Sequence, residues 1–396
     1  MTVRTGAPRR VKSAGGTRVV VDLPAGELWF EVDAEHEHLL SHRADHVAVS
    51  LIMPAMQAGS NVHVGGVVTD ELLHHLNGDL QAVIRLLHPT YGQIEVSADE
   101  VAPADSRKAG VATGFSAGVD SFAVLAEHFH DESVPDSLRV THLLNNNVGS
   151  HGMGGEDLWK KRLIGVHHVA AEIGLPLVAV NSNLDEHYPW TGFVESHTAR
   201  NAAVAHLLGG GIGRLLYASA VHYREVHAYP GAGIAYVDPI TLPLLSTSGL
   251  ALTSAGSAQT RVDKTLAIID TPQVKLLDVC IDFDAGREGN CSHCWKCLRT
   301  MFTLEVAGRL DDFCPTPFSK GPYLAERAAF RRELLATNDP LVREVAEFAK
   351  DRGWTWSAQE RALATGLRAK RRGRKALGSF KHRLSRPLRS VRPNVH

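Results

Sequence analysis

The chain has 396 residues, of which 44% are hydrophobic and 21% charged, values typical of a folded globular protein rather than a disordered one. This length exceeds what one small hydrophobic core organises, so we expect two domains or more. The formal net charge of −1 excludes a uniformly basic nucleic-acid-binding protein.

The small net charge hides an uneven distribution along the chain. Residues 368–396 contain 11 of the 42 Lys and Arg residues and no Asp or Glu, which leaves 31 basic residues against 43 acidic ones in the rest. We predict a basic tail that is disordered in isolation and that contacts an anionic partner, either a lipid surface or a nucleic acid. The alternative is a tail that only keeps the protein in solution.

The sequence also bears on the compartment. No apolar run reaches the roughly 20 residues of a membrane-spanning helix, and the basic N-terminus has no apolar stretch behind it. We therefore expect no transmembrane segment, no secretory signal and a cytoplasmic protein. Four of the five cysteines crowd between Cys280 and Cys297, which favours a metal site over a secreted disulfide framework. Nothing in the sequence indicates the oligomeric state.

Residues 1–105 are predicted to form a small N-terminal α+β domain. Residues 19–23 and 28–32 have the composition of two strands and flank a Pro-Ala-Gly turn, which predicts a hairpin. Leucines at helical spacing predict a helix over residues 69–76. The segment 103–106 interrupts these patterns and marks the domain boundary.

From residue 106 the chain alternates between short apolar strands and helices, which predicts an α/β fold with a doubly wound parallel sheet. In such a sheet ligands bind beyond the carboxyl ends of the strands, so the loops after the strands form the expected site. Strands are expected at 109–115, 138–144, 177–180 and 214–218, and helices between them at 157–173 and 199–208.

The remaining chain is predicted to be helical as far as the basic tail. Helices are expected at 298–310, 323–335, 340–351 and 357–367. We therefore divide the chain after the N-terminal domain into a central domain over residues 106–310, a helical region over residues 311–367 and the tail.

The segment Ser116-Ala117-Gly118-Val119-Asp120-Ser121 leads directly from a predicted strand into an apolar helix. Small residues at such a turn expose successive backbone N–H groups, which bind phosphate. The two serine hydroxyls add donors, and the Asp120 carboxylate can hold Mg²⁺ against a phosphate. The segment is neither a Walker A loop nor a dinucleotide-binding Gly-x-Gly-x-x-Gly. The alternative is an ordinary helix cap.

This segment resembles the Ser-Gly-Gly-x-Asp-Ser signature of the PP-loop ATP pyrophosphatase superfamily. The resemblance implies an adenine nucleotide alpha hydrolase-like fold, with ATP and Mg²⁺ as cofactors and residues 116–121 at the phosphates. It also implies that Asn145, after the second strand, lies where the family contacts adenine and ribose. Ala117 replaces a glycine of the family, and its Cβ is expected to require a negative φ or to crowd an approaching phosphate.

Four cysteines, Cys280, Cys291, Cys294 and Cys297, are the predicted metal ligands. Four thiolates this close suit a tetrahedral structural Zn²⁺. Their order resembles the 7-cyano-7-deazaguanine synthase branch of the superfamily, in which a lone cysteine precedes a zinc-binding Cys-x-x-Cys-x-x-Cys cluster. An iron–sulfur cluster and thiols without a metal are the alternatives. His293 is interpreted as a spacer.

Arg261 and Lys264 are three residues apart on a predicted helix and can face the same anion, either a phosphate or a substrate carboxylate. We predict that they act with Asp120 as catalytic residues; the alternative is a solvated helix face. His38 and His42 precede His46 at the same spacing, but their charged neighbours favour an exposed face over a metal site.

Together these features predict an ATP-dependent ligase or synthase. The resemblance implies transfer of AMP to a small-molecule substrate, most often a carboxylate, with release of pyrophosphate, and then attack by an amine, ammonia or another nucleophile. Sulfur insertion and epimerisation through an activated acyl group are alternatives within the superfamily. Outside it, the alternatives are a non-catalytic nucleotide-binding regulator and a nucleic-acid-modifying enzyme recruited by the basic tail.

Overall fold

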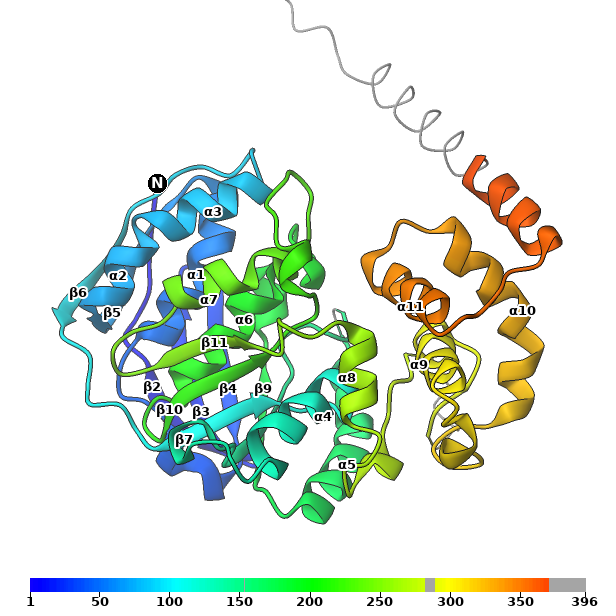
Figure 1. Ribbon diagram of the computed structural model, residues 1–396. Coiled ribbons are helices and arrows are strands. Elements are labelled where there is room, and N and C mark those ends of the chain that lie inside the picture. Colours follow the sequence, from blue (N-terminus) through cyan, green and yellow to red (C-terminus); the bar gives the residue numbers. More distant parts are fainter. Residues whose placement is uncertain (153, 282–288, 370–396) are drawn as a thin grey trace, which may run out of the picture. The chain divides into compact units, whose positions relative to one another are not determined.

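The computed structural model describes residues 1–152, 154–281 and 289–369, so most of the predicted basic tail lies outside the described residues. The chain divides into two compact units, one ending at Val279 and the other beginning at Cys280. The first unit is α/β, with an eight-stranded mixed sheet and a three-stranded parallel sheet, and the second unit is helical (Figure 1).

The elements are as follows in chain order. The strands are β1 Thr2–Arg4, β2 Arg9–Ser13, β3 Gly16–Leu23, β4 Gly26–Val32, β5 Asn61–Thr69, β6 Val96–Ala102, β7 Gly110–Gly114, β8 His142–Asn146, β9 Leu177–Ser182, β10 Ile212–Ala218 and β11 Ala251–Ala255. The helices are α1 Asp45–Ala58, α2 Asp70–Leu76, α3 Asp79–Leu87, α4 Val119–Leu125, α5 Glu156–Ile173, α6 Phe193–Leu207, α7 Asp238–Leu244, α8 Arg261–Ala267, α9 Trp295–Val306, α10 Lys320–Ala336 and α11 Pro340–Asp351, with a further helix at 358–369. Short 3-10 and π-helical turns are η1 Ala34–Leu39, η2 Ala126–His130, η3 Asp136–Leu138, η4 Leu184–His187, η5 Tyr223–Glu225, η6 Ile234–Val237, η7 Val274–Leu276 and η8 Leu310–Phe313.

The large sheet has the strand order β11-β10-β7-β8-β9-β4-β3-β2. Strands β7 to β11 are parallel to their neighbours, whereas β4 pairs antiparallel with β9 and continues into the predicted β3–β4 hairpin, which is confirmed. The sheet is therefore mixed and not wholly parallel. The hairpin satisfies backbone groups that β9 would otherwise expose at an edge. For this reason β2, β3 and β4 of the predicted N-terminal domain share one sheet with the central strands, whereas β1, β5 and β6 form the three-stranded sheet. The predicted boundaries at residues 105 and 310 do not match the division at Val279.

Strand order reverses at β7. The chain passes from β7 to β8 and β9 on one side, and then returns to place β10 and β11 on the other side of β7. Right-handed crossovers put α4 and α5 on one face of the sheet and α6 and α7 on the opposite face, as Figure 1 shows. Beyond the carboxyl ends of β7 and β10 the chain therefore departs to opposite faces of the sheet. Open α/β sheets bind ligands in the crevice at such a point.

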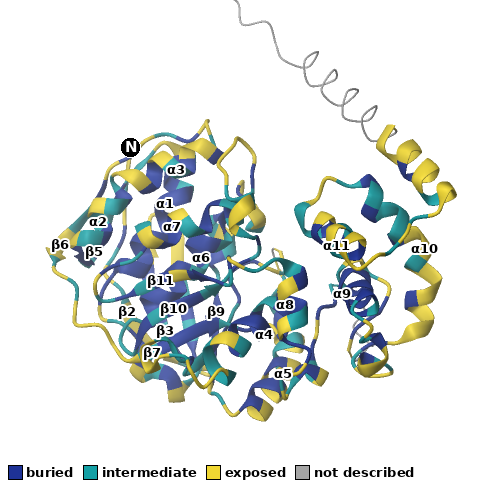
Figure 2. Cartoon of the chain, in the orientation of Figure 1, coloured by how far each residue is buried: buried dark blue, intermediate teal, exposed yellow. Residues whose placement is uncertain are grey.

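Helix α1 forms the centre of the N-terminal part. Almost all of its residues are buried, and it packs against α6 and against β5 of the three-stranded sheet. It ends at Gly59, whose φ of 63° closes the helix with a left-handed residue. In Figure 2 the central strands are mostly dark blue, because helices cover both faces of the sheet.

The predicted exposed histidine face forms only in part: His38 and His42 are exposed, but His46 is not. Helix η1 ends at Leu39 and α1 begins only at Asp45, so His38 and His46 lie on different elements, and His46 is fully buried beside Phe30. Burial lowers the pKa of His46 to about 3, so the ring is neutral. The prediction is wrong for His46 because two of the charged neighbours make buried contacts inside the protein.

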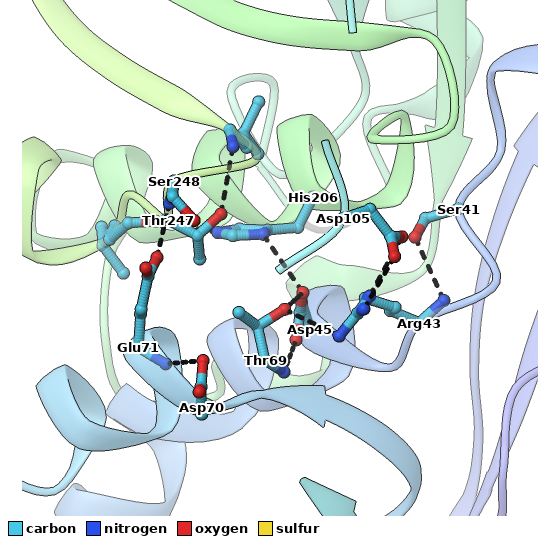
Figure 3. Close-up of polar contacts among 12 residues, drawn as sticks. Ser41, Arg43, Asp45, Thr69, Asp70, Glu71, Asp105, His206, Thr247 and Ser248 are labelled. Atoms are coloured by element: carbon cyan, nitrogen blue, oxygen red, sulfur yellow. Dashed lines mark hydrogen bonds and ion pairs between the residues drawn. The ribbon is translucent and has the colours of Figure 1, made fainter. Parts of the chain in front are cut away.

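Arg43 and Asp45 are those neighbours, and Figure 3 shows their contacts. Arg43 Nη2 lies 2.8 Å from Asp105 Oδ1, an ion pair between the start of α1 and the segment before β7. Asp45 accepts hydrogen bonds from the backbone N–H and the hydroxyl of Thr69, at 2.7 and 2.6 Å. Both charges are therefore buried with partners, as such charges must be.

The second unit is a helical cluster around Phe302 of α9. The Phe302 ring lies 5.9 Å from that of Phe330 on α10 and 5.1 Å from that of Trp354. Arg331 and Glu360 join α10 to the helix at 358–369 through an ion pair of 2.8 Å. The four helices predicted for this part of the chain are confirmed. Over the described ranges, no helix has the length and apolarity needed to span a membrane.

Candidate functional site

The segment Ser116–Ser121 lies where the sequence analysis expected it, between a strand and a helix. Strand β7 ends at Gly114, and α4 begins at Val119, the residue after Gly118. Because β7 is the strand at which the sheet reverses, the segment projects from the middle of the carboxyl edge. The Ser121 hydroxyl donates to the Gly118 carbonyl at 2.9 Å and is buried, whereas Ser116 is exposed and accessible to a ligand.

Ala117 has a left-handed backbone, with φ of 56°. The expectation that an alanine requires a negative φ here is wrong. Its carbonyl accepts a hydrogen bond of 2.8 Å from the backbone N–H of Asp278, and its side chain is buried. An alanine pays about 1–2 kcal/mol for this conformation, whereas a glycine avoids the penalty. The segment thus keeps the backbone shape that a glycine would favour.

Asp120 faces both predicted basic residues. Arg261 Nη2 lies 2.7 Å from Asp120 Oδ2, and Lys264 Nζ lies 3.5 Å from Oδ1. Both bases come from α8, which packs against α4 and begins with a capping box between Thr260 and Asp263. The three groups carry one net positive charge beside the segment Ser116–Ser121. Such an arrangement is suited to an anion with several oxygens.

Lys264 is almost completely buried and also donates a hydrogen bond to the carbonyl of Ser219. Ser219 directly follows β10, so the ammonium group lies between the loops after β7 and β10. Sequence reasoning missed Ser219, because a backbone carbonyl leaves no signature in the sequence. Its place after a predicted strand was the only signal that could have found it.

Asn145 has a structural role in this arrangement. Its amide nitrogen donates to the carbonyl of Phe115 at 2.8 Å, and its amide oxygen accepts a hydrogen bond of 2.7 Å from Trp159 Nε1. Both ends of the side chain are thus engaged within the protein. Asn145 therefore fixes the start of the Ser116–Ser121 segment to β8, a positioning role that the sequence analysis did not anticipate.

The second unit contains a cluster of four cysteine sulfurs. The Sγ atoms of Cys280, Cys291, Cys294 and Cys297 all lie within 4.8 Å of one another, so the four can hold a metal ion. Cys291 Sγ and Cys297 Sγ are 3.7 Å apart. Zn–S bonds of about 2.3 Å in a tetrahedron place sulfurs about 3.8 Å apart, so this spacing fits zinc. Cys280, the most distant in sequence, belongs to the group.

Backbone N–H groups point at these sulfurs. The N–H groups of Cys294 and His293 lie 3.1 and 3.4 Å from Cys291 Sγ, and that of Cys291 lies 3.4 Å from Cys280 Sγ. A hydrogen bond from Cys297 lowers the pKa of Cys294 to about 4, and the neighbouring thiolate raises the pKa of Cys297. These contacts favour the thiolate at Cys294, one of the four thiolates that metal ligation requires. His293 is exposed and is not one of the four ligands.

Comparison with known proteins gives no family for this chain: no protein-family model, no curated protein and no solved structure matches it. The resemblance to the PP-loop superfamily therefore rests on two short motifs. The structure itself shows an α/β unit with an acid and two bases beside a tight loop, and a helical unit with four cysteines that can hold a metal.

Proposed function

We propose that this protein is an ATP-dependent enzyme of the PP-loop superfamily, built on the doubly wound adenine nucleotide alpha hydrolase-like fold. It binds ATP at Ser116–Ser121, transfers AMP to a small-molecule carboxylate and releases pyrophosphate. An amine, ammonia or another nucleophile then displaces AMP. One observation carries the proposal: Arg261 and Lys264, which are far from Asp120 in the sequence, each lie within 3.5 Å of its carboxylate as ion pairs.

The roles of these residues follow from their chemistry. The Arg261 guanidinium offers two parallel N–H groups to phosphate oxygens, and the buried Lys264 ammonium supplies a fixed positive charge. Mg²⁺ would neutralise charge on the phosphates, and Asp120 is the carboxylate that would hold it. Because the reaction separates pyrophosphate from the α phosphate, stabilising the charge that develops on the leaving group lowers the barrier most.

Zinc is proposed as the metal of the second unit. A closed shell of four thiolates leaves no open coordination position, so the ion has a structural role. Residues Cys280, Cys291, Cys294 and Cys297 would hold it. The sulfur spacing and the N–H groups directed at the sulfurs support this assignment.

A non-catalytic nucleotide-binding regulator is the second candidate. It is favoured by the state of Asp120, because both carboxylate oxygens already face basic groups and Mg²⁺ must compete with them. It is also favoured by Ala117, whose methyl group occupies the position of a glycine in the superfamily signature.

The test is pyrophosphate release from ATP and Mg²⁺ in the presence of a panel of carboxylates. For the enzyme we expect steady release, and a decrease of at least about 100-fold in Asp120→Asn. Asp136→Asn changes an acid whose side chain is fully exposed and serves as the matched control. ATP binding without release by the wild-type protein would favour the regulator. Failure to bind ATP at all would rule out both candidates.

A further inference from the structure

A chain of hydrogen bonds crosses the carboxyl ends of three strands on the α6 face of the large sheet. It begins at Tyr217 near the end of β10, whose hydroxyl lies 2.7 Å from His197 Nδ1 and 3.5 Å from Asn201 Nδ2, both on α6. Asn201 Oδ1 then accepts a hydrogen bond of 3.0 Å from the amide of Asn146, the last residue of β8. Because β10 and β8 are the two neighbours of β7, this chain bridges the end of β7.

Gly114, the last residue of β7, lies beneath the bridge. It pairs with Leu144, two residues before Asn146, and Tyr217 lies one residue beyond the partner of Thr113. Side chains of paired residues share a face of the sheet and alternate along each strand, so Gly114, Tyr217 and Asn146 face α6 together. A Cβ added to Gly114 would meet no other atom within 4 Å. The space above Gly114 is therefore open.

Asn146 contributes a hydrogen-bond acceptor without a donor. Asn201 Nδ2 is fixed by its hydrogen bond of 2.8 Å to the carbonyl of His197, so the oxygen of Asn201 must face Asn146. Asn146 consequently donates with its nitrogen, and its own Oδ1 is left as an acceptor. That oxygen is buried and accepts no hydrogen bond from any residue in the described ranges. A buried acceptor in this state costs stability until a donor reaches it.

The titratable groups of this hydrogen-bonded chain are uncharged near neutral pH. Burial lowers the pKa of His197 to about 4, and burial raises the pKa of Tyr217 well above its ordinary value. Asp238, which accepts a hydrogen bond of 2.5 Å from the hydroxyl of Thr198 beside His197, has its pKa raised by burial to about 8. The α4 face of the same edge, by contrast, has the charged groups of Asp120 and α8. An anion or an ammonium ion therefore finds no opposite charge among Tyr217, His197 and Asn146.

We propose that the space over Gly114 is a second ligand subsite, which binds an uncharged N–H donor such as a carboxamide or an amino group on an aromatic ring. The N–H group donates to Asn146 Oδ1, and the hydroxyl of Tyr217 and the ring of His197 complete the polar lining. The donor belongs either to the base of a nucleotide or to a separate acceptor molecule. A role of this subsite in catalysis rests on the proposed function, whereas the binding of an N–H donor to it does not.

The subsite is tested with benzamide, benzoate and methyl benzoate, titrated without nucleotide and observed by ligand NMR. We expect saturable binding of benzamide only, because benzoate is charged and methyl benzoate has no N–H group. In Gly114→Val the side chain fills the space, and we expect benzamide binding to weaken at least tenfold with no decrease in Tm. Gly165→Ala, at a helical glycine that also borders open space, is the matched control and should bind benzamide as the wild type does.

Several results would overturn the proposal. They are the absence of benzamide binding, equal binding of benzoate, unchanged binding in Gly114→Val, and a marked decrease in the Tm of Gly114→Val, which would mean that the space is not open. The source of the donor is resolved by competition. Displacement of benzamide by ATP but not by tripolyphosphate assigns the subsite to the nucleotide base, and simultaneous binding of ATP and benzamide assigns it to a separate acceptor.

Discussion

The residues that form the two candidate sites are separated by very different distances along the chain. In the first unit, Asp120 meets bases from α8, and the sheet brings them together through two sets of crossovers on opposite faces. In the second unit, all four sulfurs lie between Cys280 and Cys297, and hydrogen bonds within that segment orient them. A site of the first kind depends on the whole fold, whereas a site of the second kind depends on a short segment and on the metal that closes it.

The largest effect on stability is expected for Cys291→Ser, in the second unit. Structural zinc contributes roughly 10 kcal/mol or more to small metal-dependent domains, so loss of one ligand should remove the metal and the cooperative unfolding of the second unit. The first unit should unfold as in the wild type, because its core does not include the cluster. Mass spectrometry measures the metal content, and calorimetry measures the unfolding of the two units. Cys314→Ser is the control and should keep one metal ion per chain; retention of metal by Cys291→Ser would contradict the assignment.

Asp238 gives the first unit a pH dependence of its own. The carboxyl pKa is 3.8 ordinarily and about 8 in the folded protein, so between these values the folded state binds more protons than the unfolded state. Its contribution to the free energy of unfolding therefore falls as pH rises through this window, by at most about 1.4 kcal/mol per pH unit, and is constant above it.

Denaturant unfolding at pH 5 and pH 7 measures this effect. Relative to Asp238→Asn, in which the group cannot ionise, the wild type should lose about 3 kcal/mol between the two values. Equal pH profiles of the two proteins would show that Asp238 ionises normally in the folded state.

Gly149 tests how strongly the loop after β8 is constrained by the side chains packed beneath it. The measurement is the free energy of unfolding in denaturant. Its φ is 104°, and an added Cβ would lie 2.3 Å from Arg200 Nη1 and 2.3 Å from Asp185 Oδ1, an ion pair buried under the loop after β8. We expect Gly149→Ala to destabilise the protein by about 3 kcal/mol. Gly152→Ala is the matched variant in the same loop, where φ is also positive but no atom lies within 4 Å of the added Cβ. It should cost about 1 kcal/mol. Equal costs for both would show that Arg200 does not constrain the loop.

The smallest changes in stability are expected for one residue beside each site. Ala117 and Ser292 are the non-glycine residues with positive φ among those described, at 56° and 62°. Ala117→Gly relieves strain and should stabilise the first unit by up to about 1 kcal/mol. Ser292→Gly relieves similar strain but removes the hydroxyl that accepts a 2.9 Å hydrogen bond from the backbone N–H of Ser319, so a net loss of about 1 kcal/mol is expected. Thermal unfolding of both variants checks the opposite signs.

Sequence reasoning succeeded where a pattern is local. The β3–β4 hairpin, the helix at 69–76 and the cysteine cluster follow from turn residues, leucine spacing and thiol spacing, all within short segments. It missed α1, because that helix is buried on nearly every side and contains Pro54, so it shows neither an apolar stripe nor an unbroken helical composition. It also missed β11, a five-residue edge strand that the sheet defines by pairing with β10.

The domain division and the charged histidine segment could not be predicted for a related reason. A hairpin has no local signal for the strand that it will join, so the pairing of β4 with β9 is decided by the unpaired edge of the sheet. Likewise, Arg43 and Asp45 look like surface charges until Asp105 and Thr69 are placed beside them.

The sequence by itself determined the chemistry of this protein: a tight loop with one acid, a pair of bases three residues apart, and four thiols at metal-ligand spacing. The tertiary structure decided which of these meet. Only the reversal of strand order at β7 brings α8 to α4, and only the pairing of β10, β7 and β8 places the open space of Gly114 beneath uncharged groups on the other face. Residue types are fixed along the chain, whereas distances between remote residues depend on backbone pairing and burial, which no short segment encodes.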